Sequence, residues 1–395
     1  MVGRCYLALA VVLVLIAPLF SVAAYGQEQA PVWAVERARE WDILFDGTSG
    51  WTGADGIYSI PLSGVEAHGS AAETHTIFVF SDTFIGDVGT DGRRLRGTTI
   101  VNNTGALLRS GEPEPDKINF IWEEDEEGKA AALFVPNTPA AQPGDWYWLC
   151  DGASIGGKIY LFAMRMREGD GGAFNFAVDG VALLTFSPDA PDPLSEYTEV
   201  DTPLFYVPSD GRGDIIFGNA IMPNTVEAEA PAPDGYVYIY GHQNDPYSKR
   251  LVAARVLPEH FDDFSMWRFW DGFAWSPDIG TVAPLAGRIS SEFSMSPLPD
   301  GRFVLVFQFD TLSDYVAIRV GSTPIGPFGP IIKIWLCPEP ALDPDIYTYN
   351  AKAHPHLSRP GELLISYNVN TLDFWDHFAY ADIYRPRFIR IRLGL

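Results

Sequence analysis

A pattern of paired apolar strands recurs along the chain. In residues 289–310, ISSEFSMSPLPDGRFVLVFQFD, two apolar runs flank a turn at Pro299-Asp300-Gly301. Runs rich in Val and Phe, bounded by Pro, Asp and Gly, are typical of β-strands joined by a tight turn. The pattern returns in residues 53–84, 146–165, 217–243 and 349–370. We therefore expect five related β-hairpins.

The spacing of these hairpins suggests a repeating unit. Their second strands are expected to begin near residues 77, 158, 236, 302 and 362. A repeat of roughly 60 to 80 residues suits one four-stranded propeller blade with its loops. Third strands are expected in residues 101–108, 180–187, 249–257, 314–321 and 377–393. Fourth strands are expected in residues 117–124, 203–208, 267–273 and 331–337. The sequence thus predicts an all-β fold, a single five-bladed β-propeller.

The last repeat lacks a fourth strand of its own. The N-terminal segment 32–45, VWAVERAREWDILF, is expected to supply it and so to close the ring. Closure would remove the unpaired edge that a partial sheet leaves. A β-sandwich with a second domain is the alternative architecture, but no linker or break in composition marks a domain boundary. We expect one domain over residues 25–395.

The N-terminal segment reads as a secretory signal. Arg4 supplies a positive charge, residues 5–20 form an apolar core, and Val22-Ala23-Ala24 resembles a cleavage site. The signal is therefore expected to span residues 1–24. Because the apolar run is close to the length that spans a bilayer, an uncleaved anchor is the alternative. The mature protein is expected to be exported, periplasmic or extracellular, without membrane contact.

Composition and charge restrict the partners. Of the 395 residues, 47% are hydrophobic, which is ample for a large core. The net charge of −24 argues against nucleic acid, which is bound through a basic face, and it also disfavours anionic polysaccharides. Once the signal is removed, Cys150 and Cys337 are the remaining cysteines. We expect both to be free and buried, with a single disulfide as the alternative.

Polar residues stand where the channel-lining first strands of a propeller are expected. Lys352, His354 and His356 are spaced by two, which would place them on one face of a strand. Charged groups that converge on one axis are costly to bury without pairing or function. Asp-Gly turns and structural histidines are the alternative explanations. The candidates in the five first strands are Asp55, Asp151, Asn219, Glu292 and the Lys352, His354, His356 series.

Further candidates lie near these strands. Asp82 ends a second strand and could reach the channel mouth or cap a loop, and His242 has the same position in its own repeat. Asn103 is polar within an apolar strand. Trp148 lies just before Asp151, where an aromatic ring could stack on a sugar or pack in the core.

The chemistry of these residues points to glycosidic bond cleavage. That reaction requires one protonated carboxyl group and one ionised carboxylate, and a third charge can separate their pKa values. The sequence lacks phosphate-binding, dinucleotide-binding, zinc-protease and nucleophilic-serine motifs. No cofactor is expected. A calcium or other ion bound in the channel is the alternative.

Several motifs resemble known families. GADGIYSIPL (53–62), FVFSDTFIG (78–86), VNNTG (101–105) and YNAKAHPHLS (349–358) resemble an exported bacterial family known as a domain of unknown function. That family is similar to a sister family that includes endo-acting D-arabinan hydrolases. One acid per first strand also resembles five-bladed glycosidases of the arabinanase and xylosidase group and of the levansucrase and invertase group.

The resemblance implies roles for three acids. It implies Asp55 as base or nucleophile, Asp151 as the acid that tunes pKa values, and Glu292 as proton donor. The chain departs from the glycosidase pattern at Asn219, where the third blade would carry the donor glutamate. This departure leaves Asp82 as a rival for either catalytic role.

Three functions are therefore considered. The leading hypothesis is a secreted glycoside hydrolase that cleaves a polysaccharide, with an arabinan as candidate substrate. A non-catalytic carbohydrate-binding propeller is the alternative, and a polysaccharide lyase with His354 as base and Lys352 at a uronate is a third. The predicted substrate contacts are Asp82, Asn103, Trp148, Asn219, His242, Lys352 and His354.

Overall fold

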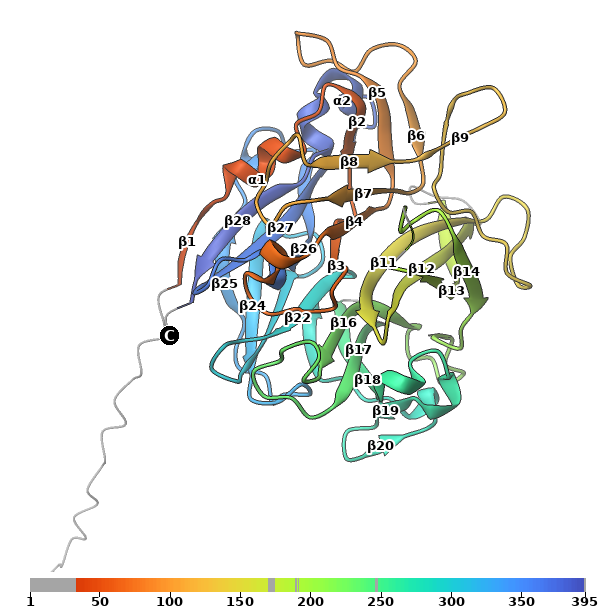
Figure 1. The fold of residues 1–395 in the computed structure, drawn as a ribbon, viewed down its shortest axis with the longest axis vertical. Helices are drawn as coiled ribbons and strands as arrows, with labels where there is room; N and C mark the ends of the chain where they lie inside the picture. The colour runs from red at the N-terminus through yellow and green to blue at the C-terminus, as the bar shows by residue number, and fades with distance from the viewer. Residues whose placement is uncertain (1–32, 170–174, 189, 191, 246–247, 394–395) are drawn as a thin grey trace, which may run out of the picture. The chain divides into compact units, whose positions relative to one another are not determined.

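The computed structural model describes residues 33–169, 175–188, 190, 192–245 and 248–393. The predicted signal, residues 1–24, lies outside this range. Strands dominate the described part, which confirms the predicted all-β class (Figure 1). The α-helices are α1 (Arg39–Leu44) and α2 (Asp376–Ala379), and the rest of the helical structure described is 3-10 turns. Within the described part, no helix has the length and apolar character needed to cross a membrane.

Five sheets of the described chain each contain one of the predicted hairpins. The first sheet has the order β3 (Tyr58–Pro61), β4 (Thr76–Phe80), β7 (Thr104–Leu108), β8 (Ile118–Ile121). The second has the order β11 (Trp146–Ile155), β12 (Lys158–Glu168), β13 (Phe176–Phe186), β14 (Tyr197–Asp201). The third has the order β15 (Phe205–Tyr206), β16 (Ile215–Asn224), β17 (Tyr236–Asp245), β18 (Ser248–Val256), β19 (Arg268–Trp270), β20 (Trp275–Ser276), with β21 (Ala286–Ile289) also paired to β18.

The fourth sheet has the order β22 (Phe293–Pro297), β23 (Phe303–Gln308), β24 (Tyr315–Gly321), β25 (Ile332–Leu336). The fifth has the order β26 (Ile346–Ala353), β27 (Glu362–Thr371), β28 (Arg387–Arg392), β1 (Ala34–Arg37). The N-terminal segment therefore supplies the fourth strand of the fifth sheet, as predicted. Two small sheets accompany these five: β2 (Ser49–Ala54), β5 (Thr83–Asp87), β6 (Thr99–Val101), and β9 (Glu123–Glu124) with β10 (Ala130–Ala131).

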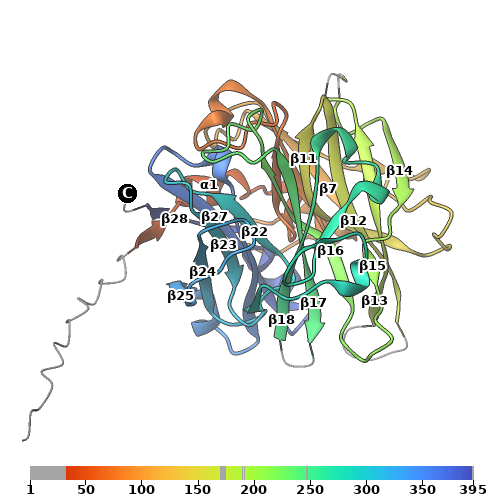
Figure 2. The ribbon, with the colours of Figure 1, turned by 90° about the horizontal axis from the view of Figure 1, so that it is seen from below.

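The first strands of consecutive sheets lie next to one another. β11 contacts both β3 and β16, and β22 contacts both β16 and β26. Seen from below, β16 lies between β22 and β12 (Figure 2). The first and fifth sheets share a core that includes Phe78, Phe80, Leu364 and Phe388. The first strands of the five sheets thus form a consecutive series from β3 to β26.

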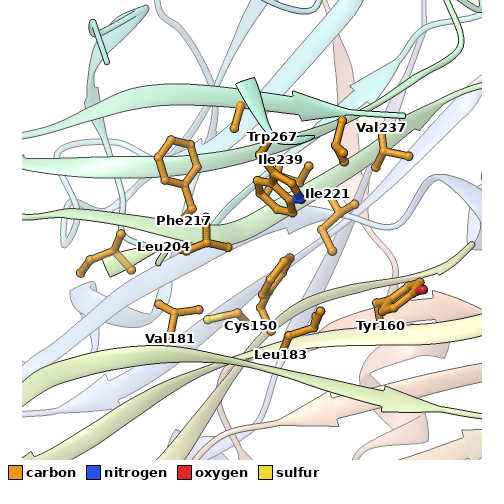
Figure 3. Packing of buried hydrophobic residues seen from close by; sticks show 14 of the residues in the cluster. Cys150, Tyr160, Val181, Leu183, Leu204, Phe217, Ile221, Val237, Ile239 and Trp267 are labelled. Atoms are coloured by element: carbon orange, nitrogen blue, oxygen red, sulfur yellow. The ribbon is translucent and has the colours of Figure 1, made fainter. Parts of the chain in front are cut away.

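Apolar side chains fill the space between neighbouring sheets. Between the second and third sheets, Cys150 and Leu183 face Phe217 and Ile239 (Figure 3). Such burial of aliphatic and aromatic groups is the main favourable contribution to folding. Cys150 and Cys337 are both buried and free, which confirms the prediction for these cysteines.

Two predicted strands differ from the structure. Residues 203–208 were expected to complete the second sheet, but β14 does so, and β15 pairs with β16 in the third sheet. Pro203 stands between them and lacks the N–H needed to continue a ladder, so the chain crosses to the next sheet here.

Residues 377–393 were expected to form one strand, but only β28 is extended. The 3-10 turn η7 (Ala381–Tyr384) follows α2, and His377, Phe378 and Tyr384 all contact the ring of Phe84. Neighbouring residues of a strand point to opposite faces, so a strand could not bring both His377 and Phe378 to one ring.

Candidate active site

Bulges in the first strands aim polar side chains away from the regular pleat. The pairing register shifts in β11, in β16 and in β26. The bulged stretches contain Asp151, Asn219 and Asn350, respectively. A bulge bends its strand and re-aims a side chain. In three of the repeats, a polar side chain therefore stands on backbone that departs from the regular strand.

Asp55 and Asp82 lie together where the paired strands β2 and β5 meet the first sheet. Asp55 follows β2 and Asp82 precedes β5. The Ser81 amide donates to the Asp55 carbonyl (2.9 Å), and the Asp55 amide donates to the Asp82 carbonyl (3.3 Å). Gly56 has a φ of 67°, and a Cβ there would lie 2.7 Å from Ser81 Oγ. The Asp55-Gly56 turn therefore requires glycine.

A chain of hydrogen bonds connects Asp55 to α2. The Tyr349 hydroxyl donates to Asp55 Oδ2 (2.7 Å), and Asn370 Nδ2 donates to the Tyr349 hydroxyl (3.1 Å). His377 Nε2 lies 2.8 Å from Asn370 Oδ1. These contacts hold the Asp55 carboxyl group in one orientation.

Asp82 is held by nitrogen donors. Trp148 Nε1 donates to Asp82 Oδ1 (3.0 Å), and Asn102 Nδ2 donates to the same oxygen (3.4 Å). The Trp148 ring packs against Phe176, with ring centroids 4.6 Å apart. The structure therefore brings Trp148 to Asp82, where its indole N–H acts as a hydrogen-bond donor. Its ring packs against a neighbouring ring and is not a free aromatic face.

Burial raises the pKa of both carboxyl groups toward neutral pH. It raises the pKa of Asp55 to about 7, and the nearby charges of Asp82 and Glu292 raise this pKa as well, against the hydroxyls of Tyr349 and Tyr384. Burial raises the pKa of Asp82 to about 6, against its Trp148 and Asn102 donors. Both residues stay partly exposed. Two neighbouring carboxyl groups with such pKa values share a proton near pH 6 to 7.

Glu292 forms a buried ion pair. Lys352 Nζ lies 2.5 Å from Glu292 Oε2, and Asn350 Nδ2 donates to Oε1 (2.8 Å). Glu292 is 8% exposed and Lys352 1%, and the ammonium lies 4.1 Å from the centre of the Tyr58 ring. Both carboxylate oxygens are thus engaged by protein donors.

Asp151 lies in different surroundings from Asp55. Its oxygens accept from the amides of Gly152 (2.9 Å) and Ile221 (2.7 Å). Burial raises its pKa to about 8, with Glu66 raising it further and Lys352 lowering it. Asp151, Glu66 and Lys352 line a small cavity of about 40 Å³. The charged neighbours that raise the pKa of Asp55 are instead Asp82 and Glu292.

The predicted common face of Lys352, His354 and His356 is wrong. β26 ends at Ala353, and His356 lies in the 3-10 turn η6 (Pro355–Leu357). The His354 amide still donates to the Leu364 carbonyl (2.9 Å), but Pro355 has no amide to continue the ladder, so the alternation of the strand stops before His356. His356 Nδ1 lies 3.6 Å from a Glu66 carboxylate oxygen.

His354 is fully engaged in the interior. Nδ1 lies 2.7 Å from Ser59 Oγ, and Nε2 lies 2.8 Å from Ser366 Oγ. Burial holds its pKa well below the usual value, with Lys352 and His356 contributing in the same direction. With both nitrogens bonded, His354 has no free nitrogen to act as the base of a lyase.

Three other predicted contact residues bond to protein groups. Asn219 Oδ1 lies 3.1 Å from His242 Nδ1, and burial holds the pKa of His242 well below its usual value. Asn103 Nδ2 donates to the carbonyls of Phe134 and Tyr147. All three predicted residues are buried. None of them has a hydrogen bond to Asp55 or Asp82 among the described contacts.

The structure adds residues that the sequence reading missed. Tyr349 and Asn370 fall inside predicted strands, and Tyr384 and His377 fall where a strand was wrongly expected. The available signal was Asn350, a further polar residue in the first strand that also contains Lys352. Among the described residues, no group of three or more His, Cys, Asp or Glu side chains is placed to hold a metal ion.

Comparison with solved structures defines the fold class. The chain resembles a putative hydrolase from Bacteroides ovatus, with a TM-score of 0.68, 18% identity and 92% of each chain covered. It is also similar to a family 117 glycoside hydrolase from Zobellia galactanivorans (TM-score 0.44, 11% identity, 91% of this chain and 89% of that one). An α-L-arabinofuranosidase from Podospora anserina gives a TM-score of 0.42 at 11% identity, over 86% of this chain and 98% of that one. The first likeness shows a shared fold.

The chain belongs to the family described as "Domain of unknown function (DUF5005)", which it matches over residues 38–393. The predicted resemblance to a family of unknown function is therefore confirmed. No curated protein matches the sequence.

The Tyr349 hydroxyl offers a direct test of the Asp55 site. Because its hydrogen bond lowers the pKa of Asp55, Tyr349→Phe should raise that pKa by about one pH unit. The pKa is measured by NMR titration of carboxyl carbons in aspartate-labelled protein. Tyr347→Phe is the matched control, since Tyr347 lies close enough to interact with the Asp55 charge but has no hydrogen bond to it among the described contacts. Equal titration of both variants would contradict the bond.

Proposed function

We propose that this protein is a glycoside hydrolase whose two catalytic carboxyl groups are Asp55 and Asp82. One observation carries the proposal: two adjacent carboxyl groups, both on half-buried residues, have pKa values raised to about 7 and about 6. Glycosidic bond cleavage requires one carboxyl group that keeps its proton and one that is ionised. A pair that shares one proton near neutral pH meets this requirement.

The surroundings suggest which carboxyl group holds the proton. Asp82 accepts from the N–H groups of Trp148 and Asn102, which favour the ionised form. Asp55 is more strongly affected by burial and by neighbouring negative charge. We therefore assign Asp55 as the general acid and Asp82 as the ionised carboxylate that attacks the anomeric carbon or activates water.

Glu292 and Asp151 receive other roles in this scheme. Glu292 is ion-paired to Lys352, so it has no free oxygen from which to protonate a leaving group. Its charge raises the pKa of Asp55, which makes it a positioning and tuning residue. Asp151 bonds to two backbone amides beside Glu66, where it stabilises the bulge of β11.

The proposed setting is a five-bladed ring closed by β1, in an exported protein. The neighbouring first strands and the pairing of β1 with β28 support the ring. The net charge of −24 favours a neutral glycan over an anionic one. We propose a neutral polysaccharide as the substrate class, with an arabinan as the first candidate.

The test is incubation of the purified mature protein with arabinan, xylan, β-1,3-galactan and levan. Product chromatography should reveal saturated oligosaccharides from at least one polymer, and the Asp55→Asn/Asp82→Asn double variant should release none. Binding without any product would favour the carbohydrate-binding alternative. Products that absorb in the ultraviolet would instead indicate a lyase.

A further inference from the structure

An exposed aromatic cluster lies on the segment that carries α2. Trp375 is 71% exposed and Phe374 is 50% exposed. Their ring centroids are 5.7 Å apart at an interplanar angle of 74°, and Phe378 lies 5.9 Å from Trp375. We call Phe374 and Trp375 the aromatic platform. Its rings contact one another and the ring of Phe378.

Other exposed apolar side chains lie near the platform in the chain. Leu372 is 68% exposed and Tyr380 is 59% exposed, on the same short segment. Contiguous exposed apolar groups on a soluble protein usually mark a binding surface, whereas single ones are normal. Asp373 precedes Phe374 and Asp376 follows Trp375 in the chain, and their carboxylates accept from the Trp375 amide and the Thr371 hydroxyl. A partner of this surface therefore combines an apolar face with polar groups and carries no negative charge.

The underside of the segment is attached to the Asp55 and Asp82 site. His377 stacks on Phe84, with ring centroids 5.4 Å apart, and Phe84 lies two residues after Asp82 in β5. The hydrogen bonds from His377 through Asn370 and Tyr349 end on Asp55. Arg94 donates to the His377 carbonyl and fixes the other side of the turn. Figure 1 shows α2 beside β2 and β5.

We propose that Phe374 and Trp375 form a distal subsite that stacks on a sugar ring of a neutral glycan chain bound at Asp55 and Asp82. A sugar ring presents apolar C–H groups on its faces and hydroxyls at its edge, which matches an aromatic face with carboxylates next to it in the chain. Phe374 contacts His377, which is linked to Asp55 through Asn370 and Tyr349, so the platform lies outside the carboxyl pair itself. This inference rests on the proposed function and adds to it a preference for long chains.

Trp375→Ala tests the subsite. We expect kcat/KM for the cleaved polymer to fall about tenfold, the loss of one stacking contact, while kcat/KM for a disaccharide or aryl glycoside of the same sugar changes less than about twofold. Phe273→Ala is the matched control, because Phe273 is 94% exposed but lies in the β19–β20 turn of the third sheet. Equal losses on polymer and short substrate, or no loss on either, would overturn the subsite.

Binding separates this inference from the proposed function. Affinity electrophoresis of the full mature chain in gels containing arabinan, xylan, β-1,3-galactan or levan needs no catalysis. Retardation in one gel that Trp375→Ala abolishes and Phe273→Ala retains supports the subsite, even if no polymer is cleaved. Unretarded migration of the wild type in all four gels overturns it. A change of oligomeric state in Trp375→Ala, with retardation unchanged, would identify the platform as a subunit interface instead.

Discussion

Asparagine at position 55 or at position 82 is expected to lower kcat/KM for glycan hydrolysis by about 10²- to 10⁴-fold, the range for loss of a positioned acid or base. The amide keeps the shape of the carboxyl group and can still accept from Tyr349 or from Trp148. Asp82→Asn removes a charge that is costly to bury, and Asp55→Asn replaces a carboxyl group that keeps its proton, so the free energy of unfolding should not fall in either variant. Circular dichroism and urea unfolding would check that the fold is intact.

The two variants should differ in how they are rescued. If Asp55 is the acid, Asp55→Asn should retain activity on an aryl glycoside whose leaving group needs no proton. If Asp82 is the ionised partner, added azide or formate should restore part of the activity of Asp82→Asn. Asp116→Asn is the control, because the Asp116 side chain is 78% exposed. Full activity in either variant would remove that residue from the scheme.

The same pair predicts a narrow pH profile. Activity should rise with pH as Asp82 ionises near pH 6 and should fall as Asp55 loses its proton near pH 7. Both limbs belong to the coupled pair rather than to isolated groups. The Asp55→Asn variant should lose the alkaline limb on an activated substrate.

The second large effect concerns stability. Lys352→Met is expected to lower the free energy of unfolding by about 3–5 kcal/mol, because it leaves the Glu292 carboxylate buried without its cation. Glu292→Gln should cost a similar amount, since it leaves Lys352 unpaired. The double variant Lys352→Met/Glu292→Gln should recover much of the loss, because it leaves no uncompensated charge. Urea unfolding midpoints measure all three.

An exposed ion pair provides the control. Lys158 and Asp262 lie 2.9 Å apart with side chains 51% and 46% exposed, so Lys158→Met should change stability by less than about 1 kcal/mol. Similar losses for Lys352→Met and Lys158→Met would contradict the importance of the buried pair. Glu292→Gln has a second readout: without the negative charge of Glu292, the pKa of Asp55 falls, and the alkaline limb of the pH profile should move to lower pH.

The positions of the second strands could be predicted because they follow from local sequence patterns. The second strands begin at residues 76, 158, 236, 303 and 362, each within one residue of the position expected from its turn. Turn residues and apolar runs act within a few positions of one another, so a single sequence contains them. Sheet membership is not local: whether residues 203–208 join the second or the third sheet depends on which edge lies nearest in space.

The site was predictable in its residue types but not in its grouping. Asp55, Asp82, Glu292 and Lys352 were all named from the sequence, yet equivalence of repeat position grouped Asp55 with Asp151 and Glu292 and left Asp82 as a rival. The bulges break that equivalence, since an extra residue re-aims a side chain without leaving a reliable sequence signal. Asn350 adopts a φ of 59° in such a bulge and was not found.

The sequence by itself determined the all-β class, the five hairpins, the acidic surface and a set of polar residues in the first strands. These follow from periodicity, turn chemistry and charge, which are properties of neighbouring residues. Only the tertiary structure decided that Asp82 is the neighbour of Asp55, that Lys352 neutralises Glu292, and that the segment leading into α2 presents an aromatic platform tied to the site. Such pairings depend on distances between segments far apart in the chain, and both burial and charge interactions follow those distances rather than sequence separation.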